Sequence, residues 1–63
     1  MLKNLFDKEL QKLANCTINV LYHFGRCTMV LEIMLETNEI GSEEYKELKQ
    51  LVSNTFIKTN KNI

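Results

Sequence analysis

The sequence predicts an all-α fold: a long helix over about residues 2–37 and a shorter helix over about 43–58, packed as an antiparallel hairpin that self-associates into a helical bundle. Apolar residues recur with the period of a helix. Proline is absent, only two glycines occur, and one cluster of turn-forming residues divides the chain. At 63 residues we expect a single domain spanning 1–63.

The first predicted helix is apolar on two faces. Its main stripe follows a heptad pattern and consists of Phe6, Leu10, Leu13, Val20, Phe24, Cys27, Leu31 and Met34. A second stripe lies nearly opposite and consists of Ile18, Tyr22, Gly25, Met29 and Ile33. A helix that is apolar on two faces must be covered on both, so the pattern predicts more packing than one short partner helix supplies.

Gly25 lies within the second stripe, where its missing side chain allows another helix to approach closely. Glycine also weakens a helix by about 1 kcal/mol relative to alanine, so a break at this position is an alternative. The register of the main stripe continues through Phe24, Cys27 and Leu31, which favours one continuous helix. A break near Gly25 would instead produce a three-helix monomer.

The turn between the two predicted helices covers residues 38–42. Asn38 and Gly41 tolerate left-handed backbone conformations, and Ser42 is a good N-terminal cap for the next helix. The apolar stripe of that helix consists of Tyr45, Leu48, Leu51, Val52, Thr55 and Phe56. The polar tail 59–63 is expected to fray.

The unequal lengths of the two predicted helices indicate self-association. At 1.5 Å per residue they would span roughly 50 Å and 24 Å, so the short helix covers only half of the long one. The uncovered apolar surface is too large for a monomer and favours a two-fold homodimer. The residues that we expect to mediate self-association are Phe6, Leu10, Leu13, Val20, Leu21, Phe24 and Gly25.

Charge is unevenly distributed although the formal net charge is zero. Residues 32–47 contain six Glu and one Lys, a surface suited to a basic partner protein. The candidate protein-binding residues are Glu36, Glu39, Glu43, Glu44 and Glu47. The sequence therefore predicts a small non-enzymatic regulator, inhibitor or adaptor that binds another protein of unknown identity and itself.

An alternative function is RNA or DNA binding. A polar stripe of cationic and amide side chains on the first predicted helix could contact phosphates, and it consists of Lys8, Lys12, Asn15, Asn19 and Arg26. The length and hairpin layout of the chain resemble the Rop family of plasmid RNA modulators. This resemblance implies a dimeric hairpin that binds RNA through a helix face.

Catalytic and metal chemistry have weaker support. The chain has one histidine and lacks a glycine-rich phosphate loop. Cys16, His23 and Cys27 fall within about 20° of one line on a continuous helix, so a metal-bridged dimer is a third hypothesis, but no metal or cofactor is predicted. Polar side chains within 13–31 argue against a membrane span, and we expect a cytoplasmic protein without a signal peptide.

Overall fold

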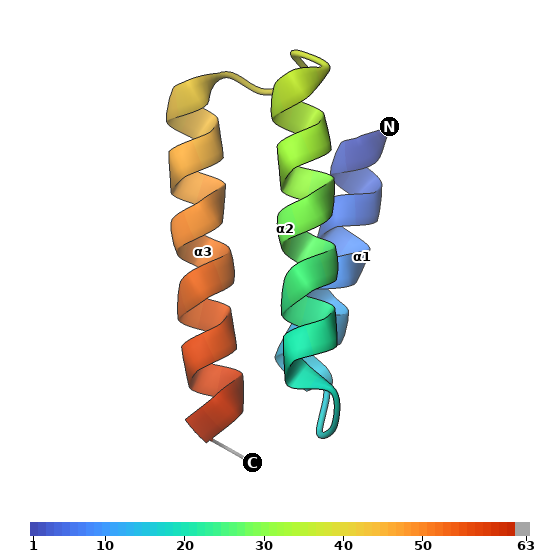
Figure 1. Ribbon diagram of the computed structural model, residues 1–63, viewed down its shortest axis with the longest axis vertical. Helices are drawn as coiled ribbons and strands as arrows, with labels where there is room; N and C mark the ends of the chain where they lie inside the picture. Colours follow the sequence, from blue (N-terminus) through green and yellow to red (C-terminus); the bar gives the residue numbers. More distant parts are fainter. Residues whose placement is uncertain (62–63) are drawn as a thin grey trace.

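The computed structural model describes residues 1–61, which form three α-helices: α1 (Leu2–Asn15), α2 (Val20–Glu36) and α3 (Ser42–Lys61). Consecutive helices run in opposite directions, with the turn after α1 at one end of the bundle and the α2–α3 connection at the other (Figure 1). Each helix contacts the other two. The predicted all-α fold is therefore confirmed for the described residues.

The prediction of one helix over 2–37 is wrong, because residues 16–19 separate α1 from α2. Cys16 has an extended backbone, and Asn19 adopts the left-handed conformation with φ 57° and ψ 40°. The segment from Asn15 to Asn19 consists entirely of poor helix formers, two of them β-branched. Low local propensity and the tertiary contacts of α1 outweigh the heptad pattern here.

Gly25 does not break a helix, because α2 continues through it from Val20 to Glu36. The three-helix arrangement that we considered as the alternative does occur, but its additional turn lies at residues 16–19 rather than near Gly25. The separation of α1 from α2 lets α1 fold back along α2 (Figure 1).

The connection between α2 and α3 terminates α2 and contributes a buried side chain, Ile40, to the core. Asn38 has a positive φ of 63°, and the backbone N–H groups of Glu39 and Ile40 both donate to the Met34 carbonyl, at 2.9 and 3.3 Å. This pattern satisfies the Met34 carbonyl near the end of α2, and the Ile40 side chain is buried. Glu43 and Glu44 lie in the first turn of α3, where the helix dipole favours anions.

Helix α3 is longer than the sequence predicts. It begins at Ser42 and extends to Lys61, beyond the predicted end at 58. Thr59 is buried against the bundle, so the expectation that the tail frays from residue 59 is wrong for 59–61. Residues 62 and 63 lie outside the described part of the chain.

The core lies between the three helices and contains much of the surface that we assigned to self-association. Its buried apolar residues are Phe6, Leu13, Cys27, Val30, Leu31, Met34, Ile40 and Val52. Phe6 and Leu13 lie on α1 and are already buried in the core of a single chain. The prediction that they form a contact between chains is therefore wrong. Three more members of that set pack against the core and are half-buried: Leu10, Val20 and Phe24.

Candidate protein-binding surfaces

One side of α2 remains apolar and exposed. We call it the α2 outer face and define it as Leu21, Tyr22, Gly25, Met29 and Ile33. At 100° per residue these positions occupy a sector of roughly 120° around the helix. Leu21 is 73% exposed, Tyr22 59% and Met29 53%. The covered part of the same helix carries Cys27, Val30, Leu31 and Met34, so the bundle buries only half of a helix that is apolar nearly all round.

Gly25 lies in the middle of the α2 outer face, and nothing among residues 1–61 requires a glycine there. Its φ is not positive, and a Cβ added to it would meet no atom within 4 Å. A glycine within a helix costs about 1 kcal/mol relative to alanine. Within a single chain, therefore, Gly25 lowers helix stability without providing a turn or a close contact.

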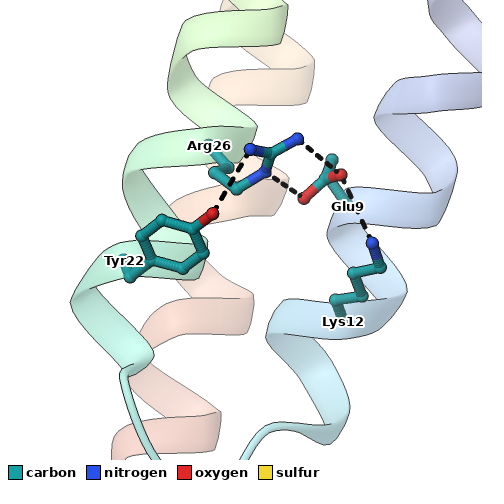
Figure 2. Close-up of polar contacts among 4 residues, drawn as sticks. All are labelled: Glu9, Lys12, Tyr22 and Arg26. Atoms are coloured by element: carbon teal, nitrogen blue, oxygen red, sulfur yellow. Dashed lines mark hydrogen bonds and ion pairs between the residues drawn. The ribbon is translucent and has the colours of Figure 1, made fainter.

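Beside this face, a buried carboxylate joins α1 to α2. The Glu9 side chain is only 2% exposed and accepts two hydrogen bonds from Arg26, from Nε at 2.9 Å and from Nη2 at 3.2 Å (Figure 2). Arg26 Nη1 donates to the Tyr22 hydroxyl at 3.3 Å, and Lys12 Nζ lies 3.7 Å from Glu9 Oε2. The hydrogen bond from Arg26 lowers the pKa of Glu9 despite the opposing effect of burial.

Sequence reasoning missed Glu9. The available signal was its spacing: Glu9 lies three residues after Phe6 and four before Leu13, on the side of α1 that is buried. A carboxylate in such a position needs a partner, but the sequence does not identify Arg26 as that partner, because the two residues meet only when α1 folds back along α2. Arg26 is thereby committed to a bidentate bond with Glu9, and it is not part of an uninterrupted cationic stripe along the first helix.

The remaining members of the predicted nucleic-acid stripe are divided between α1 and the turn. Lys8, Lys12 and Asn15 lie on exposed positions of α1, where with Gln11 they line a shallow depression. Asn19 lies in the turn and has a left-handed backbone. This conformation, which asparagine tolerates better than most residues, accounts for an asparagine at this position without a bound ligand. Three of the five predicted residues thus line one depression, and Arg26 is linked to Lys12 only through their shared contact with Glu9.

The acidic residues gather at the end of the bundle where α2 connects to α3. Two of them hold the start of α1: Glu44 Oε2 lies 2.7 Å from Lys3 Nζ, and Glu39 Oε2 accepts a 2.9 Å hydrogen bond from the Lys3 backbone N–H. Glu36, Glu43 and Glu47 are exposed. The predicted acidic surface therefore combines residues with an internal role and residues that face solvent.

Cys16, His23 and Cys27 do not form a cluster. Within residues 1–61 the structure contains no group of three or more His, Cys, Asp or Glu side chains placed to hold a metal. Cys27 is buried in the core, and burial raises the pKa of its thiol to about 11. Cys16 donates instead to the Leu13 carbonyl at 3.2 Å, and His23 Nδ1 is buried without a hydrogen-bond partner in the described part of the chain.

Comparison with known proteins identifies no relative. Among the described residues, none of the three helices combines the length and apolar character needed to cross a bilayer. The chain matches no known protein family, and neither a curated protein nor a solved structure is significantly similar to it.

Proposed function

We propose that this protein is a small non-enzymatic regulator, inhibitor or adaptor that acts in the cytoplasm by binding another protein and by self-association. The observation that carries the proposal is the α2 outer face, which places four large apolar side chains on one exposed helix surface. Contiguous apolar patches on folded proteins are typical of interaction sites, and Tyr and Met are enriched in protein interfaces. Two free cysteines are in keeping with a reducing compartment.

The acidic end supplies a second contact for a partner protein. Glu36, Glu43 and Glu47 are exposed, whereas Glu39 and Glu44 hold α1. An acidic surface attracts a basic partner and favours it over acidic competitors. A partner that contacts both surfaces would present a basic patch beside an apolar one.

Affinity capture from cells tests this proposal. A variant that carries Glu36→Lys, Glu43→Lys and Glu47→Lys reverses the exposed charges without touching Glu39 or Glu44. Met29→Ser removes an apolar side chain from the α2 outer face, and Ile57→Ser is the matched control because Ile57 on α3 is also exposed, at 52%. We expect the same captured protein to be lost with the charge reversal and with Met29→Ser but retained with Ile57→Ser. Equal capture by all four proteins would contradict the proposal.

A second candidate function is nucleic-acid binding through α1. It is favoured by the depression that Lys8, Gln11, Lys12 and Asn15 line. Lysine contacts with phosphate release counterions, so binding would weaken steeply with salt. Titration of single- and double-stranded RNA and DNA in low salt, with Lys8→Ala and Lys12→Ala as variants, tests it. Absence of binding in low salt would rule this function out.

A further inference from the structure

Two features of α2 have no explanation within the described part of a single chain. Its outer face leaves Leu21, Tyr22 and Met29 each more than half exposed. At the centre of this face, Gly25 has open space above it and an ordinary helical backbone, so neither a turn nor a close contact with another described residue accounts for it. Both features are explained if another helix crosses α2 at Gly25, because a missing side chain lets two backbones approach.

The distribution of charge along the bundle indicates which helix crosses α2 at Gly25. The end at the α2–α3 connection is acidic, because Glu36 ends α2, Glu39 lies in the connection, and Glu43, Glu44 and Glu47 lie near the start of α3. The opposite end, at the α1–α2 turn and the end of α3, is basic, and its lysines include Lys12, Lys58 and Lys61. The chain is therefore electrostatically complementary to a copy of itself turned end over end.

We propose that the α2 outer face binds the same face of a second copy, with the two α2 helices antiparallel and crossing at Gly25. This inference rests on the proposed function and identifies a second copy of the chain as the partner that binds the α2 outer face. A two-fold axis beside Gly25 makes the contact self-complementary, because each copy presents the same residues to the other. It also places the acidic end of each copy near the basic end of the other.

The size of α2 limits the strength of this dimer. A helix of 17 residues is about 26 Å long, so the contact is smaller than a standard protein interface. Rim charges contribute through long-range attraction that salt screens. The dimer is therefore expected to dissociate in a measurable concentration range and to weaken as salt rises.

Sedimentation equilibrium over a range of concentrations tests the dimer. The variants are Met29→Lys on the α2 outer face and Ile57→Lys on α3, whose original side chains are 53% and 52% exposed. We expect a monomer–dimer equilibrium for the wild type and for Ile57→Lys. Met29→Lys should raise the dissociation constant roughly 30-fold or more, since it introduces an unpaired charge into the contact. Circular dichroism confirms that all three proteins are equally helical.

Cysteine cross-linking tests the orientation in a Cys16→Ser background, in which Cys27 remains buried. In the antiparallel arrangement with the two-fold axis beside Gly25, residue 21 of one copy lies opposite residue 29 of the other. A mixture of Leu21→Cys and Met29→Cys proteins should therefore form disulfide-linked heterodimers faster than either protein forms homodimers. Faster homodimer formation by both single variants would indicate parallel helices and overturn the proposed orientation.

A wild type that stays monomeric at every concentration overturns the inference, and so does a dimer that Met29→Lys and Ile57→Lys weaken equally. One such outcome would remove self-association from the proposed function but leave its binding of another protein. If the wild type is monomeric but Met29→Lys alone loses a captured protein, the α2 outer face binds a different protein and not a second copy. A dimer that strengthens as salt rises would also contradict the end-over-end alignment of charges.

Discussion

The two sides of α2 carry similar side chains in different surroundings. On the inner side, Leu31 and Met34 are buried by α1 and α3. On the outer side, Tyr22 and Met29 are more than half exposed, although the sequence pattern is equally apolar there. The difference shows that apolar periodicity identifies which surfaces must be covered, while the position of the turns decides which of them the chain covers itself.

The strongest test of this comparison uses one substitution on both sides of α2. Met34→Ala removes a fully buried side chain and should lower the free energy of unfolding by about 2–5 kcal/mol, because it leaves a cavity. Met29→Ala on the outer side should change it by no more than about 0.5 kcal/mol. Chemical denaturation at a concentration where the protein is monomeric measures both. Equal losses would show that the outer side is also packed within the chain.

The turn that directs α1 to the inner side depends on Asn19. Its left-handed backbone is strained for most residues, so Asn19→Val should destabilise the protein by about 1–2 kcal/mol. Asn19→Gly adopts the same conformation freely and should be close to neutral. Thermal unfolding of both variants checks this. A neutral Asn19→Val would mean that the turn tolerates another conformation.

A smaller effect, seen mainly at acid pH, should come from the bond between α1 and α2. Because Arg26 lowers the pKa of Glu9 in the folded state, the stabilisation by the Glu9 carboxylate is fully present above its unfolded value of about 4.5 and is lost as pH falls through the lower folded value. Denaturation as a function of pH should show this loss for the wild type. Glu9→Gln should reduce it, whereas Glu36→Gln, at an exposed position, should leave it unchanged.

The last test does not alter stability. It compares how fast the two thiols of the native protein react with a labelling reagent. Cys27 faces the core and its thiol pKa is raised to about 11, so little reactive thiolate is present at neutral pH. Cys16, in the turn, is partly exposed. In a thiol-reagent assay the wild type should therefore lose one thiol quickly, and Cys16→Ser should react only as fast as the protein unfolds. Rapid labelling of Cys16→Ser would show that the inner side opens readily.

Sequence reasoning identified the helical class, the turn after α2 and the second apolar stripe. It placed one helix through residues 16–19 because the main stripe keeps its register there, and it underestimated five successive residues of low helix propensity. That error moved Phe6 and Leu13 from the core to an expected interface. The pairing of Glu9 with Arg26 depends on α1 folding back along α2, and helical periodicity within one segment contains no information about such a contact.

The most direct test of the central claim is the effect of Gly25→Ala on two quantities measured in the same protein. In the monomer the added methyl group meets open space and improves the helix, so the free energy of unfolding should rise by up to about 1 kcal/mol. In the dimer the same methyl group obstructs the close approach of two helices, at a cost of about 1–3 kcal/mol, so the dissociation constant should rise roughly 5- to 150-fold. The account predicts these opposite changes. A variant that is more stable and associates as tightly as the wild type would contradict it.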